Sequence, residues 1–160
     1  MADVFTKVKR SEVMSRIRSR GNKDTELALA KLLRRHRISG WRRQVEIRGR
    51  ASLPRGPIIT AALQHRPTLR VRPDFVFKEA RLALFVDGCF WHGCPKHATK
   101  PRNNSAFWRR KFAANKARDR LVNRALRIAN WSVLRVWEHE LTRKNEARLL
   151  RRICAALTGL

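Results

Sequence analysis

The sequence predicts an α/β domain, and three observations support this fold class. Helical and strand-like hydrophobic patterns alternate along the chain in the order helix, three strands, helix, strand and helix, which is typical of an α/β layer architecture. Hydrophobic residues make up 43% of the chain and include five Trp and seven Phe, enough to form a core. The length of 160 residues fits one domain, or one domain with a tail.

The chain begins with a basic segment that is followed by a helix. Residues 1–22 contain six lysines and arginines but two acids, and we expect them to form a basic N-terminal arm. A helix follows from Asp24 or Thr25 to about Arg35. Its buried stripe consists of Leu29, Leu32 and Leu33. Glu26 stands in the first turn of this helix, and its side chain is expected on the core side.

Three strands are expected next. Residues 41–47 form the first one. The stretch 48–70 is rich in Gly, Pro and Arg and predicts either a long loop or an inserted hairpin. Strands over 73–77 and 81–86 are separated by three residues, which suits a hairpin.

The longest helix is expected over 105–129. One side of it carries Trp108, Phe112, Val122 and Leu126. Asn115 and Asp119 fall on the same side, which is unusual for a plain amphipathic helix. They are expected to brace a functional site or to form a buried hydrogen-bond network. A strand over 131–137 and a basic helix over 141–157 complete the pattern.

The charge of the chain favours an anionic partner. Lys and Arg number 38 against 12 acids, so the formal charge is +26, and nucleic acid is the expected partner. No run of about 18 apolar residues is present, which argues against a membrane protein. The N-terminus also lacks an apolar signal-peptide core, so we expect a cytoplasmic protein. Three cysteines are too few for a disulfide scaffold.

Two aspartates predict a divalent-metal site. Asp74 stands in the strand 73–77, and Asp87 comes directly after the strand 81–86. If the two strand ends meet, the carboxylates form an oxygen-lined pocket of the kind that Mg²⁺ prefers. A metal there could activate water against a phosphate. The alternative is that both aspartates are ordinary turn residues.

Soft ligands gather in the following loop. Cys89, Cys94 and His97 lie within nine residues, and His139 follows a later strand. Thiolate and imidazole groups are the usual ligands of structural Zn²⁺. The alternative is two free thiols in a reducing cytosol. Cys154, in the last helix, is expected to be a small buried apolar residue and not a ligand.

The same loop contains Phe90, Trp91 and His92. The two aromatic side chains could enter the DNA stack as a wedge, or they could pack under the loop against the core. His92 is a candidate general base or acid, because its ordinary pKa lies near neutrality.

Taken together, these strings resemble one family. LALFVDGCFWHGCP, preceded by RPDFVF, is similar to the very short patch repair (Vsr) mismatch endonucleases. Further similar segments are MSRIRSRGNKDTEL, FWRRKFAANKARDR and WSVLRVWEHEL, and the resemblance runs in family order from about Arg10 to Leu141. It implies a restriction-endonuclease-like core with a mixed sheet flanked by helices and a structural zinc site. Residues 23–160 would then form a single domain with an arginine-rich insertion at 48–70.

The resemblance also implies an activity. The family nicks one DNA strand 5′ to the thymine of a T:G mismatch, which arises when 5-methylcytosine deaminates, and it requires Mg²⁺. The substrate is double-stranded DNA, the location is the bacterial cytoplasm at the nucleoid, and mismatch-repair proteins are the implied partners. We expect a monomer, since no heptad pattern or exposed sticky edge is evident.

The family's site residues correspond to positions in this chain. Asp74 and the Val86 backbone would hold Mg²⁺, His92 would deprotonate the attacking water, Glu26 would orient His92, and Asp87 would lie beside the metal. The implied DNA contacts are Met14, Phe90, Trp91, Arg16, Arg18, Arg20, Asn115 and Arg118. Among these, Phe90 and Trp91 would enter the stack from one groove and Met14 from the other.

Two departures from the family pattern affect these expectations. The implied zinc ligands are Cys89, Cys94, His97 and His139, where the last replaces a residue that is commonly cysteine in the family. The insertion at 48–70 is longer than usual and predicts either added phosphate contacts or an altered target. Two alternatives therefore stay open: a site-specific or homing-type nuclease, and a non-enzymatic zinc-stabilised DNA-binding module.

Overall fold

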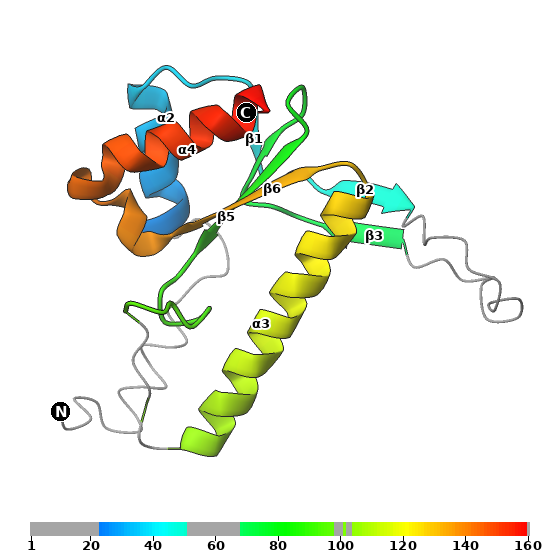
Figure 1. Cartoon of the computed structure of the whole chain (residues 1–160), viewed down its shortest axis with the longest axis vertical. Coiled ribbons are helices and arrows are strands. Elements are labelled where there is room, and N and C mark those ends of the chain that lie inside the picture. The colour runs from blue at the N-terminus through cyan, green and yellow to red at the C-terminus, as the bar shows by residue number, and fades with distance from the viewer. Residues whose placement is uncertain (1–22, 51–67, 98–100, 102–103, 160) are drawn as a thin grey trace, which may run out of the picture.

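A four-stranded mixed sheet forms the centre of this computed structural model, which describes residues 23–50, 68–97, 101 and 104–159 (Figure 1). The strand order is β1-β4-β5-β6. The bounds are Trp41–Arg43 for β1, Phe75–Phe77 for β4, Leu82–Asp87 for β5 and Ser132–Trp137 for β6. The pairs β1·β4 and β4·β5 are antiparallel, as the expected hairpin requires, whereas β5 and β6 are parallel. The prediction of an α/β fold with a mixed sheet is therefore confirmed.

The parallel pair places the polar end of β5 at one edge of the sheet. Helix α3 (Ser105–Ile128) connects β5 to β6, so the two strands and the helix form a crossover unit. Asp87 is the last residue of β5 and is in register with Trp137, the last residue of β6. The loops that follow both strands consequently leave the sheet at the same edge, where α/β folds usually bind ligands.

Helices cover both faces of the sheet (Figure 1). On one face lie α2 (Ala28–Arg35), which continues a short π-helix (Lys23–Leu27), and α4 (Glu146–Thr158). The core residues of this face include Leu29, Leu33, Phe75, Leu84, Leu149 and Ile153. On the other face, Leu126 of α3 packs with Val76 and Ala83. Across the ranges given above, no helix has the length and apolar character needed to cross a membrane.

A separate two-stranded ribbon packs beside this second core. It consists of β2 (Ile47–Arg50) and β3 (Thr68–Val71), paired antiparallel. Of the two expectations for 48–70, the structure therefore has paired strands at the base of the insertion, while residues 51–67 lie outside the part it describes. The single strand expected over 41–47 is wrong, because Gln44 has a positive φ of 55° that ends β1 and redirects the chain into the ribbon.

The last helix begins later than the sequence pattern predicts. Two 3₁₀ turns, Glu138–Leu141 and Arg143–Asn145, precede α4. The side chain of Asn145 donates to the carbonyl of His139 over 2.9 Å, and this bond stabilises the turns in place of a helical start. Cys154 is exposed, which corrects the expectation that it is buried. Leu149 and Ile153 face the core instead, so Cys154 falls on the solvent side of α4.

Candidate active site and metal centre

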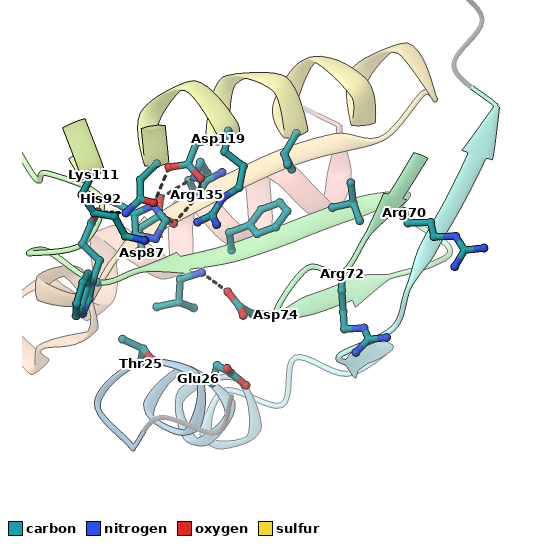
Figure 2. Close-up of a pocket in the computed structure, with 18 residues that line it drawn as sticks. Thr25, Glu26, Arg70, Arg72, Asp74, Asp87, His92, Lys111, Asp119 and Arg135 are labelled. Atoms are coloured by element: carbon teal, nitrogen blue, oxygen red, sulfur yellow. Dashed lines mark hydrogen bonds and ion pairs between the residues drawn. The ribbon is translucent and has the colours of Figure 1, made fainter. Parts of the chain in front are cut away.

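An open pocket of about 610 Å³ lies at the carboxyl end of β5. Its lining combines four carboxylates, several cations and one imidazole. Figure 2 shows Asp87, His92, Asp119 and Arg135 close together, with Asp74 and Glu26 across the pocket from Asp119. The acids are Glu26, Asp74, Asp87 and Asp119. The basic residues are Arg70, Arg72, Lys111, Arg118, Arg135 and His92. A pocket that mixes acids with cations can hold a metal ion and a phosphate together.

Asp74 is a partly buried acid of this pocket. Its Oδ2 accepts a hydrogen bond from the backbone N–H of Val86 over 2.7 Å, which ties the residue before β4 to β5. Burial raises the pKa of Asp74 to about 6; the Val86 bond lowers it, and the nearby charges of Glu26 and Asp87 raise it further. Burial and the neighbouring acids disfavour the ionised form of Asp74, whereas a bound cation would favour it. Asp74 therefore suits the role of metal ligand.

Arg135 connects two of the other acids. This residue of β6 donates to both oxygens of Asp87, with Nε and Nη2 each 2.6 Å from an oxygen, and its Nη2 also lies 3.0 Å from Asp119 Oδ1. Burial on its own would lower the pKa of Arg135, but the hydrogen bonds and charges of the two aspartates raise it above its ordinary value. The guanidinium therefore stays charged and stabilises a pair of carboxylates that would otherwise repel each other.

His92 lies next to this network. Its Nδ1 is 2.7 Å from Asp119 Oδ2 and 3.7 Å from Asp87 Oδ1. Because a carboxylate only accepts hydrogen bonds, Nδ1 carries the proton, which leaves Nε2 as the proton acceptor of a neutral ring. This carboxylate–imidazole arrangement is the one that orients a general base.

The loop after β5 is attached to α3 through aromatic rings. Phe90 lies 5.1 Å from Trp108 and 5.4 Å from Phe112, measured between ring centroids, and its ring is 5.2 Å from that of Trp91. The side chain of Asn115 donates to the Trp91 carbonyl over 2.8 Å. Phe90 and Trp91 therefore pack on the first half of α3 while staying half-exposed beside the pocket.

A second group of ligands lies behind this loop. One donor atom from each of Cys89, Cys94, His97 and His139 can be chosen so that all lie within 4.8 Å of one another. Cys94 Sγ is 3.7 Å from His139 Nδ1 and 3.8 Å from His97 Nδ1, and Cys89 Sγ is 3.2 Å from His139 Nδ1. In a tetrahedral site with Zn–S and Zn–N bonds of about 2.3 and 2.1 Å, ligand atoms are about 3.6 Å apart. The four residues thus fit one metal ion.

The protonation tendencies of this cluster agree with a metal site. Burial, together with the neighbouring Cys94 thiol, raises the pKa of Cys89, so the thiol would stay protonated without a cation. Burial and then the charge of His97 lower the pKa of His139, which keeps its ring in the neutral form that binds metals.

Comparisons with known proteins decide the family. The model of the family described as DNA mismatch endonuclease Vsr matches residues 62–98, which include β4, β5 and the loop after β5 that carries Phe90 and Trp91, here called the aromatic loop. The DNA mismatch endonuclease Vsr of Escherichia coli is 36% identical over 139 residues, which cover 86% of this chain and 74% of that protein. The chain belongs to the Vsr family of DNA endonucleases.

Other relatives of this Vsr-family chain carry the name of type II nicking enzymes. V.NaeI of Lentzea aerocolonigenes is 51% identical over 72 residues, covering 45% of this chain and 43% of that protein. V.XorIIP of Xanthomonas oryzae is 43% identical over 82 residues, covering 49% of this chain and 58% of that protein. The matched segments thus span about half the length of these nicking enzymes.

The structure brings most of the predicted site residues of this Vsr-family chain together. Asp74, Val86, Asp87 and His92 all line one pocket, as does the start of the first helix at Glu26. One predicted pairing changes: Asp119, not Glu26, contacts Nδ1 of His92. Oε2 of Glu26 instead accepts from Arg43 over 2.7 Å and from Gln44 over 3.0 Å, because the chain reversal at Gln44 brings these two side chains beside it.

The predicted DNA contacts have several outcomes. Arg118 is exposed and lines the pocket. Asn115 is 7% exposed, lines the pocket and donates to the Trp91 carbonyl, so it braces the loop, and its contact with DNA stays a prediction. The predicted contacts of the basic arm lie outside the residues that the structure describes; they are Met14, Arg16, Arg18 and Arg20.

Two features of the site were not predicted. Arg135 is the one charged residue in the mostly apolar segment WSVLRVW, and this contrast is the signal that could have identified it. Trp108 and Phe112 were expected only to pack on the domain core, yet they support the aromatic loop.

Proposed function

We propose that this Vsr-family chain is a Mg²⁺-dependent endonuclease that nicks one strand of duplex DNA 5′ to the thymine of a T:G mismatch. The observation that carries the proposal is one pocket with two separate devices: a partly buried carboxylate, Asp74, tied to β5, and a histidine held by Asp119. The arrangement fits hydrolysis of a phosphodiester, which needs a cation for the phosphate and a base for the water.

Asp74 supplies the first device. Its carboxylate and the Val86 backbone would hold Mg²⁺, with Asp87 beside them, and Asp74 has the burial and raised pKa that a cation would relieve. A bound Mg²⁺ supplies Lewis-acid stabilisation of the phosphate oxygens. Within the protein, the Val86 amide fixes the direction of the Asp74 carboxylate, so this ligand is oriented before any ion arrives.

His92 supplies the second device. The Asp119 carboxylate keeps the proton on Nδ1, so Nε2 can accept a proton from water and Asp119 stabilises the imidazolium that results. Arg135 holds Asp119 and Asp87 through the same guanidinium, and it restrains both acids as His92 changes charge. Glu26 lies at the opposite wall of the pocket, where its carboxylate accepts hydrogen bonds from Arg43 and Gln44.

The remaining residues serve the substrate and the scaffold. Phe90 and Trp91 would enter the stack beside the mismatch, where unstacking costs least, and they would do so from a base that Trp108 and Phe112 support. Zn²⁺ would be the ion of the Cys/His cluster and would hold this loop to the turn at His139. The basic arm at 1–22, with Met14, would grip DNA from the other side.

The proposal extends to the architecture and setting. The mixed sheet, its crossover through α3 and the carboxylate at the end of β5 support a restriction-endonuclease-like core for residues 23–160. The protein would act as a monomer on DNA in the bacterial cytoplasm, alongside mismatch-repair proteins.

A second candidate is a nickase that cuts a defined sequence in undamaged DNA. The relatives named type II nicking enzymes favour this function, because V.NaeI and V.XorIIP are 51% and 43% identical to this chain over their matched segments. The two candidates share the pocket and its chemistry, and they differ in whether a mismatch is needed.

The deciding experiment compares duplexes that differ at one base pair. Each strand carries its own label, and the central pair is either T:G or C:G in the same flanking sequence, with Mg²⁺ present. Nicking of only the thymine strand of the T:G duplex is the expected result. Equal nicking of both duplexes would show that no mismatch is needed and would support the site-specific nickase instead. Binding to both duplexes without nicking of either, over a panel of flanking sequences, would contradict an enzyme and favour the binding module.

A further inference from the structure

The β2–β3 ribbon presents an arginine-rich face that folding does not explain. Its two faces differ, because Ile47 and Val71 are buried on one side against the second core. On the other side, Arg48 and Arg70 are direct cross-strand partners. Like charges directly opposite each other destabilise a sheet. The ribbon therefore retains a pair that costs stability, which points to a role outside the fold.

A single carboxylate is shared among three guanidinium groups at this face. Glu46 lies 3.4 Å from Arg48, 3.9 Å from Arg70 and 4.0 Å from Arg72. The arginine side chains are 73%, 69% and 42% exposed, respectively. Exposed ion pairs at such distances contribute little to stability, so these arginines can leave Glu46 for another anion at little cost. Most of their charge stays uncompensated within this cluster.

The arginine face is continuous with the proposed active site. Arg70 and Arg72 line the same pocket as Asp74, and Figure 2 shows them along the wall that leads from Asp74 toward the ribbon. Arg70 and Arg72 stand four and two positions before Asp74, so their Cα atoms lie within at most about 14 and 7 Å of the Asp74 Cα atom. Phosphates follow one another along a DNA strand with an axial rise of about 3.4 Å, so a Cα separation of up to about 14 Å spans about four base pairs, and the arginine side chains add to this reach.

From these observations we propose that Arg48 and Arg70 on the ribbon, with Arg72 at its base, bind backbone phosphates on the DNA flank next to the nick. The occupant is the sugar–phosphate backbone, because the arginines lie beside a pocket that itself receives a phosphate and because their charge complements a polyanion. The inference rests on the proposed function, since it takes the scissile phosphate to lie at Asp74. Glu46 holds the three side chains together in the free protein and is displaced by DNA.

The test measures binding of a short synthetic duplex with a central T:G pair, without divalent cation, so that the result does not depend on nicking. The variant is Arg48→Gln/Arg70→Gln, and the matched control is Lys31→Gln/Arg151→Gln, which removes the same charge from exposed positions of α2 and α4. We expect the ribbon variant to bind about tenfold more weakly. The slope of log affinity against log salt should fall by about 1 to 2, and it should stay at the wild-type value in the control.

Glu46→Gln provides a test in the opposite direction. It removes a negative charge from the path of the phosphates, so it should tighten binding, which a misfolded variant would not do. An unchanged salt slope in the ribbon variant, or weaker binding by Glu46→Gln, would overturn the proposal. So would a loss confined to duplexes with one particular base pair near the nick, because that result means base reading and not backbone contact.

The same assay separates this inference from the proposed function. If the wild type nicks DNA but the ribbon variant binds with wild-type affinity and salt slope, only the role of the arginine face is overturned. If the ribbon variant binds more weakly as expected but the wild type nicks none of the duplexes, the proposed nuclease activity is overturned and phosphate binding by the ribbon stays supported.

Discussion

The Asp119 carboxylate contacts His92 and Arg135 at the same time: Oδ2 is 2.7 Å from His92 Nδ1, and Oδ1 is 3.0 Å from Arg135 Nη2. These three residues come from α3, from the loop after β5 and from β6. The orientation of the imidazole is thus determined by the helix and the sheet, although His92 itself stands on a loop. A catalytic group that is fixed in this way needs little reorganisation during the reaction.

Asp119→Asn tests this relationship. Asparagine can donate to Nδ1 and so favours the wrong tautomer of His92, which would lose its proton acceptor at Nε2. We expect the single-turnover nicking rate to fall by about 100- to 10,000-fold, with DNA affinity nearly unchanged. His92→Ala should cause a similar loss, and the double variant should be no worse than either single one. Losses that multiply in the double variant would show that the two residues act independently.

Arg135→Leu should destabilise the fold. It leaves Asp87 and Asp119 close together without their shared guanidinium, and breaking such a buried pair costs about 3 kcal/mol in urea unfolding. Adding Asp87→Asn should recover part of that loss, because one uncompensated charge disappears. Arg151→Gln, on the exposed side of α4, should change the unfolding free energy by less than about 0.5 kcal/mol. If Asp87→Asn deepens the loss instead, Arg135 does not act by balancing these charges.

The raised pKa of Asp74 predicts a pH dependence of stability. Its carboxyl titrates near pH 6 in the folded chain and near its ordinary value of 3.8 when unfolded, so the folded state binds the proton more tightly. This contribution is fully present below about pH 4 and is lost as the pH rises through 6. Asp74→Asn avoids the loss, so in magnesium-free buffer it should be about 3 kcal/mol more stable than wild type at pH 8 and equal to it at pH 4.

The control for this prediction uses the metal. Mg²⁺ should raise the melting temperature of the wild type at pH 8, because it binds the charged Asp74, and it should leave Asp74→Asn unaffected. If Asp74→Asn is no more stable than wild type at pH 8, or gains the same stability at both pH values, the pKa of Asp74 is not raised in the folded protein.

The Cys/His cluster predicts one tightly bound zinc ion per chain. Elemental analysis of the purified protein should find it in the wild type, and Cys94→Ser should lose it and lower the melting temperature by about 10 °C or more. Cys154→Ser is the matched control, because Cys154 is exposed on α4, away from the cluster. Full metal content in Cys94→Ser, or equal loss in the Cys154 variant, would argue against a site at these four residues.

Local sequence signals predicted the elements around the site well. The strands at 73–77 and 81–86 and the helix from Ser105 lie where hydrophobic spacing placed them. The break at Gln44 was missed, because a positive φ at a non-glycine residue is set by tertiary contacts and not by local pattern. The split of 41–47 into β1 and β2 therefore appears only in the folded chain.

The composition of the site was easier to predict than its pairings. Asp87 and the cysteines and histidines of the loop after it lie close together in sequence, so their proximity followed from the motif. The partner of His92 depends on which residue of α3 faces the end of β5, and the register of β6 determines where Arg135 projects. Glu26 was therefore paired with the wrong neighbour, although it does line the pocket.

The most direct test of this pocket as the active site measures strand-resolved nicking of the T:G duplex by four proteins, in Mg²⁺ and under single-turnover conditions. These are the wild type, Asp74→Asn, His92→Ala and the surface control Lys31→Gln/Arg151→Gln. We predict that the wild type and the control cut only the thymine strand, 5′ to the mismatched base, and that both pocket variants bind the duplex yet cut at least about 100-fold more slowly. Wild-type rates in Asp74→Asn and His92→Ala would contradict the assignment of this pocket as the active site.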